Sequence, residues 1–352
     1  MSGSFDIRRW FENRDGLLVI SGPCSVESRE QLLKTAEGLS KIKEVNVLRG
    51  GIWKPRTRPD AFEGIGEEGL RWMLEAKERY GFLTMTEVAV PEHVELALKH
   101  GIDVLWLGAR TVANPFSVQE LANCLKGCDV PVFVKNPIAP DLKLWLGAFE
   151  RLDGAGLKFL GGIHRGFASY DETQYRNAPL WELPIELLRL RRDIPVITDI
   201  SHICGCRELL QEVAQTALDM CTLGFMIETH NDPEHAMTDS NQQITPESLY
   251  NAFKRLNFRK KKVDKDEAVL QNYRKEIDVI DDELLNLIAK RMNISEMIGD
   301  FKKEHNVAVL QMDRWKNVLE DHINKGVNLG LNGQSVKEIF EIIHKDSIDR
   351  QL

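Results

Sequence analysis

Eight short apolar runs recur along the first two thirds of the chain, and stretches with helical spacing of apolar residues separate most of them. The runs occupy residues 17–20, 45–48, 82–86, 104–107, 130–134, 157–160, 194–198 and 222–227. Helical spacing extends over residues 31–39, 66–80, 91–100, 118–125, 142–152 and 207–218, and a Ser28-x-x-Gln31 capping sequence precedes the first. Eight β/α units within about 250 residues predict an α/β fold of the (β/α)8 TIM barrel type. An open doubly wound sheet is the alternative, but no Gly-x-Gly-x-x-Gly sequence follows the first run.

Length and charge limit the function classes. The 352 residues suit one large α/β domain and a small one, and a hydrophobic fraction of 43% excludes general disorder. A net charge of −8 gives nucleic-acid binding no electrostatic support. No apolar run is long enough to cross a membrane, and residues 1–13 lack the apolar segment of a secretory signal. We therefore expect a cytoplasmic protein without membrane association and without a regulatory domain before the barrel.

Charged and metal-binding side chains follow almost every apolar run, and a barrel brings the ends of its strands to one mouth. Four of these residues are able to ligate one divalent cation: Cys24, His202, Glu228 and Asp239. Six others form a ring of cations within an acidic chain: Arg49, Lys54, Arg56, Arg110, Lys135 and Arg165. Such a ring suits a small, multiply anionic substrate that bears phosphate and carboxylate groups.

Seven short motifs, in this order along the chain, resemble those of DAHP synthases. They are Gly22-Pro23-Cys24-Ser25, Leu48-Arg49-Gly50-Gly51, Lys54-Pro55-Arg56-Thr57, Gly108-Ala109-Arg110, Val134-Lys135-Asn136, His164-Arg165-Gly166 and Asp199-Ile200-Ser201-His202. The resemblance covers roughly residues 5–256. It implies condensation of phosphoenolpyruvate with erythrose 4-phosphate and release of phosphate.

The same resemblance implies roles for individual residues. The metal would be held by Cys24, His202, Glu228 and Asp239, with Mn2+ the favoured ion and Fe2+, Co2+, Zn2+ or Cd2+ as alternatives. The phosphoenolpyruvate ligands would be Arg49, Lys54, Arg110, Lys135 and Arg165. The sugar phosphate or its aldehyde would meet Arg56, Thr57 and Asp199, and of all these residues Lys54 and Asp199 would be catalytic. A sister enzyme with a five-carbon sugar phosphate is the alternative, although the motif at residues 54–57 favours the four-carbon aldehyde.

A second domain follows the barrel. We assign residues 1–256 to the barrel, the charged stretch 257–266 to a linker and residues 267–352 to a helical domain. Helical spacing from residue 267 to about 303 predicts one helix with a length on the order of 50 Å. Two shorter helices are predicted over residues 313–324 and 336–351. The last segment is predicted to begin with a capping box, Ser335-x-x-Glu338. Two short helices are too short to cover the long one, which favours a partner chain.

The helical domain resembles the all-helical class of chorismate mutases from about residue 266 to the end. The motifs that carry this resemblance are residues 270–278, Ala289-Lys290-Arg291, Lys302, Asp313-Arg314, and Asp346-Ser347 with Gln351. It implies an interlocked homodimer in which chorismate is surrounded by Arg274, Arg291, Lys302, Arg314, Ser347 and Gln351, with Arg274 from the partner. The residues with a catalytic role would be Arg274, Arg291, Lys302 and Gln351. Gln311 and Trp315 depart from the family, because acidic residues often stand at these positions.

These resemblances together predict a bifunctional enzyme of aromatic amino acid biosynthesis that also converts chorismate to prephenate. Because the barrel reaction is a natural control point, we expect prephenate, or chorismate, bound in the helical domain to inhibit it. Two alternatives remain open. In the first, the helical domain is only a prephenate-sensing dimerisation module. In the second, the barrel accepts a five-carbon sugar phosphate.

Overall fold

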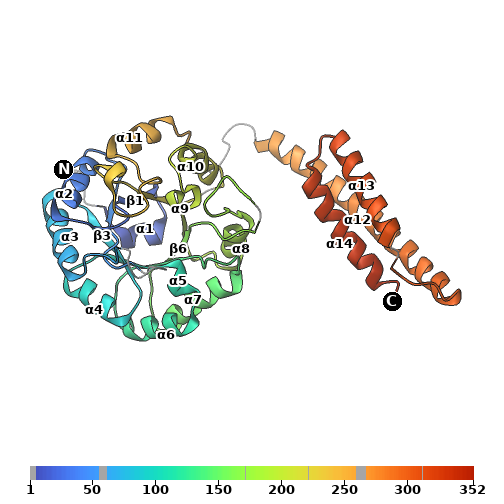
Figure 1. Cartoon of the computed structure of the whole chain (residues 1–352), viewed down its shortest axis with the longest axis horizontal. Coiled ribbons are helices and arrows are strands. Elements are labelled where there is room, and N and C mark those ends of the chain that lie inside the picture. The colour runs from blue at the N-terminus through green and yellow to red at the C-terminus, as the bar shows by residue number, and fades with distance from the viewer. Residues whose placement is uncertain (1–4, 55–61, 171, 221, 259–266, 311) are drawn as a thin grey trace. The chain divides into compact units, whose positions relative to one another are not determined.

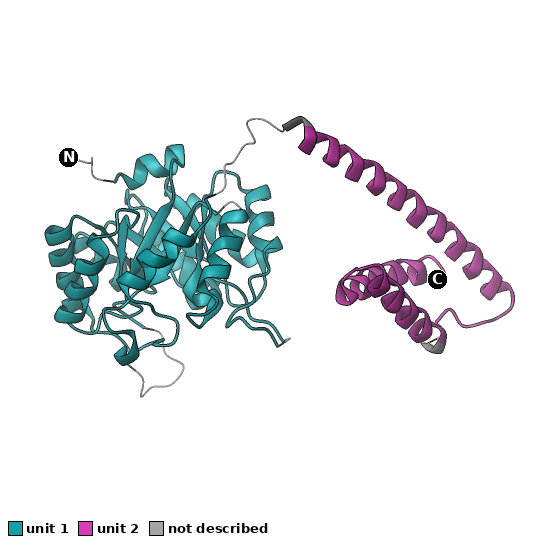
Figure 2. Ribbon diagram, turned by 90° about the horizontal axis from the view of Figure 1, so that it is seen from above, with its two compact units in different colours: residues 1–261 teal, residues 262–352 magenta. Residues whose placement is uncertain are grey.

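The computed structural model describes residues 5–54, 62–170, 172–220, 222–258, 267–310 and 312–352, without the side chains of residues 267, 268, 312 and 313. The chain forms two compact units, Met1–Lys261 and Lys262–Leu352 (Figure 2). The division between them falls inside the stretch that the sequence analysis assigns to a linker.

The first unit is a closed parallel barrel in which each strand pairs with the next and β8 returns to β1. Its strands are β1 (Leu18–Gly22), β2 (Val47–Arg49), β3 (Leu83–Val88), β4 (Val104–Leu107), β5 (Val132–Lys135), β6 (Leu160–His164), β7 (Val196–Asp199) and β8 (Gly224–Glu228). The predicted (β/α)8 fold is confirmed. Most strands end one to four residues later than the apolar runs predicted, because most of them end in a polar or charged residue, such as Lys135, Asp199 or Glu228, that breaks the apolar pattern.

Alternation along the strands divides the apolar side chains into two cores. Inward-facing residues such as Ile20, Trp106 and Phe133 fill the barrel interior, and outward-facing residues such as Val19 pack beneath the helices. The helix α1 (Ile7–Asn13) adds Trp10, which is 2% exposed, to the interior core and so closes the amino-terminal end. The sequence analysis predicted no helix at this position.

Helices surround the strands in a ring (Figure 1). They are α2 (Arg29–Ser40), α3 (Glu67–Tyr80), α4 (Pro91–Lys99), α5 (Ala109–Val112), α6 (Pro115–Cys124), α7 (Leu142–Gly154), α8 (Glu182–Leu190), α9 (Ile200–Cys204), α10 (Leu210–Asp219), the 3-10 turn η1 (Pro233–His235) and α11 (Pro246–Arg255). The predicted cap of α2 is confirmed, because the Ser28 side chain accepts a hydrogen bond from the Gln31 backbone N–H. The helices α5, α8, α9 and α11 were not predicted from the sequence.

The second unit contains the long helix α12 (Glu267–Glu304) and two shorter helices, α13 (Met312–Asn328) and α14 (Gly333–Asp349) (Figure 2). The predicted capping box at Ser335 is wrong. Asn332 caps α14 instead, because its side chain accepts from the Ser335 N–H, and the helix begins at Gly333. Every residue from 269 to 290 is exposed, and burial on α12 begins near Met292. No helix of the described residues is both long enough and apolar enough to span a membrane.

Candidate active site

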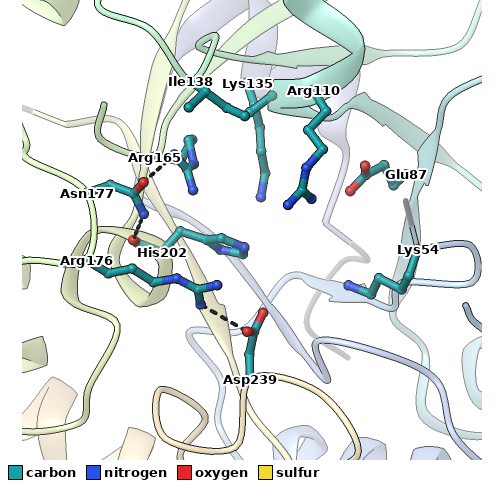
Figure 3. Close-up of a pocket in the computed structure, with 11 residues that line it drawn as sticks. Lys54, Glu87, Arg110, Lys135, Ile138, Arg165, Arg176, Asn177, His202 and Asp239 are labelled. Carbon is teal, nitrogen blue, oxygen red and sulfur yellow. Dashed lines mark hydrogen bonds and ion pairs between the residues drawn. The ribbon is translucent and has the colours of Figure 1, made fainter. Parts of the chain in front are cut away.

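The carboxyl ends of the strands surround a cavity of about 310 Å³ at the barrel mouth (Figure 3). It is lined by Lys54, Glu87, Ala109, Arg110, Lys135, Ile138, Arg165, Arg176, Asn177, His202 and Asp239. Cations predominate in this lining although the whole chain is acidic. A cavity of this size and charge is suited to a small anionic molecule.

Three of the four predicted metal ligands form a tight group beside the cavity. Ligand atoms of Cys24, Glu228 and Asp239 all lie within 4.8 Å of one another, with Cys24 Sγ 3.4 Å from Asp239 Oδ2. His202 lies outside this group. Its Nδ1 is 2.9 Å from Asp199 Oδ2 and 3.8 Å from Glu228 Oε1. A histidine that binds a metal through one ring nitrogen is usually oriented by a carboxylate that is hydrogen-bonded to the other ring nitrogen.

The chemistry of these donors fits a divalent cation. The buried Glu228 Oε1 accepts no hydrogen bond from the described residues, so this oxygen is available to bind a cation. Burial, with a smaller contribution from Glu228, raises the pKa of the Cys24 thiol to about 12, so thiolate formation needs a strong positive charge nearby. Burial, reinforced by Lys135, lowers the pKa of His202 and keeps a neutral imidazole lone pair available.

The loop that carries Asp239 is held against the end of β1 by buried hydrogen bonds. The Gln243 side chain accepts from Cys24 N–H at 2.9 Å and donates to the Thr238 carbonyl at 2.7 Å, and the Ser25 and Thr238 hydroxyls are 2.8 Å apart. Asp239 itself has a left-handed backbone, with φ of 47°, which is uncommon outside glycine. These contacts fix the Asp239 carboxylate beside Cys24.

Two predicted phosphoenolpyruvate ligands lie deep in the mouth. Arg49 is 1% exposed, its guanidinium lies over the Trp106 ring at 5.0 Å, and its Nη1 is 3.2 Å from Glu228 Oε1 without hydrogen-bond alignment. Lys135 Nζ is 2.7 Å from Asp199 Oδ2. Lys135 lines the cavity, whereas Arg49 does not. Arg49 therefore supplies positive charge from beneath the metal group.

Lys54 lies on the side of the cavity opposite Asn177, and Arg110 lies beside Lys135 (Figure 3). Lys54 Nζ is 3.2 Å from Cys24 Sγ, which places its ammonium between the metal group and the cavity. Glu87, which also lines the cavity, accepts a hydrogen bond from Trp106 Nε1 at 3.0 Å. The predicted sugar-phosphate contacts Arg56 and Thr57 lie outside the described residues.

Two polar cavity residues, Arg176 and Asn177, were not predicted from the sequence. Arg176 Nη1 donates to Asp239 Oδ1 at 3.0 Å, and the Asn177 side-chain oxygen accepts from Arg165 Nη1 at 2.7 Å. Asn177 also donates to the His202 carbonyl at 2.6 Å, so it links a substrate-facing arginine to a candidate metal ligand. Both residues lie in the irregular β6–α8 connection, where no periodicity marks them. The only feature of the sequence that could have identified them as site residues is that an arginine and an asparagine are adjacent here.

The helical unit groups a second set of polar residues between α12 and α14. The Arg291 guanidinium donates to the buried Ser347 hydroxyl, and Lys302 Nζ is 2.9 Å from Gln351 Oε1. The helices approach closely here, since a Cβ on Gly299 would lie 2.8 Å from the Gln351 Cα. The arrangement offers two cations and two neutral polar side chains to a small dianion.

Two predicted residues stand apart from this group. Arg274 is exposed and lies 17 residues before Arg291 on the same helix, a separation of about 26 Å. It is therefore too far away to join Arg291 within one chain. Arg314 is exposed on α13, and Gln311 lies outside the described residues.

Comparison with known proteins gives a match for each unit. The model of the DAHP synthetase I family matches residues 11–264, and that of chorismate mutase type II matches residues 273–352. The phospho-2-dehydro-3-deoxyheptonate aldolase of Thermotoga maritima is 31% identical over 226 residues, which cover 64% of each protein. The chain thus spans less than two thirds of that relative. A 2-dehydro-3-deoxyphosphooctonate aldolase of Wolinella succinogenes is 24% identical over 66% of this chain and 95% of its own length.

A solved structure resembles the barrel as well. The crystal structure of the DAHP synthase of Thermotoga maritima matches with a TM-score of 0.61 and 29% sequence identity. The match covers 68% of this chain and 67% of the synthase chain. A truncated form of the same synthase has a TM-score of 0.58 and 27% identity.

Proposed function

Because the chain belongs to the DAHP synthetase I family and ends in a chorismate mutase type II region, we propose that it is a bifunctional enzyme of aromatic amino acid biosynthesis. Its barrel condenses phosphoenolpyruvate with erythrose 4-phosphate, and its helical region converts chorismate to prephenate. The observation that carries the first activity is a ring of cations that lies against a group of metal-binding donors in one cavity. We further propose that the protein acts in the cytoplasm.

Within the barrel, we assign Cys24, His202, Glu228 and Asp239 to a divalent cation. We propose Mn2+, with Fe2+, Co2+, Zn2+ or Cd2+ as alternatives. An ion bound there would supply a Lewis acid for the aldehyde carbonyl. The donor set supports the assignment, because it combines a thiolate, an imidazole and two carboxylates.

The cations of the mouth bind phosphoenolpyruvate and stabilise the charges that move during the reaction. Arg110, Lys135 and Arg165 pair with its phosphate and carboxylate, and Arg49 adds positive charge from beneath. C3 of phosphoenolpyruvate forms a bond to the aldehyde carbon as the C2=C3 and C=O π bonds break. Water adds at C2 and gives up a proton, and the bond between C2 and the phosphate oxygen breaks to release inorganic phosphate. Lys54 Nζ donates a proton to the new alkoxide oxygen, and Asp199 orients Lys135.

Sugar specificity is the sharpest test of the barrel assignment. We expect phosphate release from phosphoenolpyruvate with erythrose 4-phosphate to exceed release with arabinose 5-phosphate by at least about 100-fold in kcat/KM, because the bound aldehyde has to meet C3 in a fixed geometry. The measurement is phosphate release by the full chain with each sugar, and Arg110→Ala serves as a control that lacks a cavity cation. A preference for the five-carbon sugar would instead assign the octulosonate reaction.

In the helical region, the chorismate rearrangement needs neither a nucleophile nor a metal. Arg291 and the partner's copy of Arg274 bind the two carboxylates, and Arg314 and Ser347 complete the pocket. Lys302 and Gln351 donate to the ether oxygen as its bond to carbon breaks. We propose a homodimer through α12, because its residues 269–290 expose many apolar side chains and leave Arg274 far from Arg291.

We also propose that prephenate inhibits the barrel through the helical region. Prephenate is expected to lower the synthase rate of the full chain by at least about fivefold at saturation, the lower end of common allosteric coupling. A truncated chain that ends at Leu256 should not respond, because it lacks Arg291 and Lys302. Synthase kinetics against added prephenate measure this.

The controls separate the possible effector sites. Equal inhibition of the full and truncated chains would place the effector on the barrel, and inhibition of neither would remove the regulatory role. An Arg291→Ala full chain should behave like the truncated one. Prephenate inhibition without any chorismate conversion would identify the helical region as a sensing and dimerising module only.

A further inference from the structure

One face of α14 continues the polar group of the helical unit by one turn. His344 and Ser347 on α14 and Gln351, in the turn that continues its end, are spaced at i, i+3 and i+7, which places them on one side. Ser347 meets Arg291 and Gln351 meets Lys302. His344 is therefore the next side chain along the surface that these two cations face.

The His344 ring is fixed in place but incompletely bonded. It stacks on the Trp315 ring with a centroid separation of 3.6 Å and an interplanar angle of 3°. Its Nε2 is buried and makes no hydrogen bond with the described residues, and no other buried side-chain nitrogen or oxygen of the described helical unit shares this property. A buried polar atom without a partner is costly, so its presence beside the polar group of Arg291, Lys302, Ser347 and Gln351 indicates a ligand.

The surroundings of His344 determine what kind of ligand group it suits. Burial, and then the charges of Arg291 and Lys302, lower the pKa of His344, so the imidazole is neutral near neutral pH. The two cations are better partners than a neutral imidazole for a carboxylate and for an ether oxygen that gains negative charge. A neutral ring nitrogen, by contrast, exchanges a hydrogen bond with an uncharged hydroxyl at little electrostatic cost.

We infer that His344 Nε2 hydrogen-bonds the ring hydroxyl of chorismate, and that Trp315 positions the imidazole for this contact. The inference rests on the proposed mutase function and assigns a specificity-determining residue within it. Arg291 binds a carboxylate and Lys302 the ether oxygen, while His344 recognises the hydroxyl. Trp315, which has no carboxylate to offer the hydroxyl, contributes the flat surface that holds the ring.

The test pairs a protein change with a ligand change. His344→Phe keeps a flat ring for the Trp315 stack but removes Nε2, and 4-deoxychorismate keeps both carboxylates but lacks the hydroxyl. Wild-type kcat/KM for chorismate should exceed that of His344→Phe by about three- to tenfold, the effect of one neutral hydrogen bond. With 4-deoxychorismate the two proteins should be equal. Because the ratio of the two substrates is compared within each protein, loss of active enzyme through partial unfolding cancels.

Trp315→Phe is the second variant, since it retains a smaller stacking surface. It should reduce the preference for chorismate over the deoxy analogue by less than His344→Phe does. Equal losses on both substrates in His344→Phe, or no loss on either, would overturn the inference while leaving the mutase assignment intact. If the wild-type chain does not convert chorismate at all, the proposed function fails first and the inference with it.

Discussion

Replacing Cys24 with serine is expected to lower synthase activity by at least about 100-fold and to weaken metal binding in parallel. Cys24 Sγ lies within 4.8 Å of the Glu228 and Asp239 carboxylates and is the one soft donor of the group. A serine hydroxyl is a far poorer ligand, because it remains protonated where a thiol loses its proton to the metal. Metal titration and phosphate release measure the two losses on the same preparation.

Two controls separate the metal site from a general loss of structure. Cys128→Ser removes a half-buried thiol that packs against the outer core, so synthase activity should stay within about twofold of wild type. Chorismate conversion by Cys24→Ser should also be nearly unchanged, since the mutase pocket belongs to the other unit. Full synthase activity in chelator-treated, metal-stripped wild type would contradict the metal assignment.

The barrel was predictable because its outward and inward cores both require apolar side chains on every strand. The eight runs could be recognised without any alignment. Strand ends were harder to place, because Lys135, Asp199 and Glu228 are strand residues that face the mouth and therefore break the apolar pattern. The helix α1 was missed because one buried turn with Ile7 and Trp10 is too short to produce a periodic signal.

The site was predictable in its residue types but not in its pairings. Position after a strand indicated that Arg49 belongs to the mouth, but only the three-dimensional structure reveals that it lies beneath Glu228 and outside the cavity lining. Arg176 and Asn177 come from a long irregular connection, where neither spacing nor strand position identifies a residue. The start of α14 shows the same limit, because Asn332 and Ser335 are both good caps and local sequence does not choose between them.

Arg274→Ala and Arg291→Ala are each expected to lower chorismate conversion by at least about 100-fold, because each removes a cation that pairs with one substrate carboxylate. Within one chain the two arginines are about 26 Å apart along α12, so one protomer is unable to provide both to one small molecule. We therefore propose that each site combines Arg291 of one protomer with the partner's copy of Arg274. The apolar residues that α12 exposes are the surface that we propose for the association of two such helices.

Mixing the two inactive variants gives a quantitative expectation. After subunit exchange at equal concentrations half of the dimers are mixed, and each mixed dimer has one site with both arginines and one with neither, so about a quarter of wild-type activity should return. Mixing Arg291→Ala with Lys302→Ala is the matched control. In the proposed site Arg291 and Lys302 come from the same protomer, so every site of a mixed dimer lacks one of them. No activity should return in this mixture. Recovery in the control, or none in the first mixture despite confirmed exchange, would show that each site is built differently from the shared arrangement proposed here.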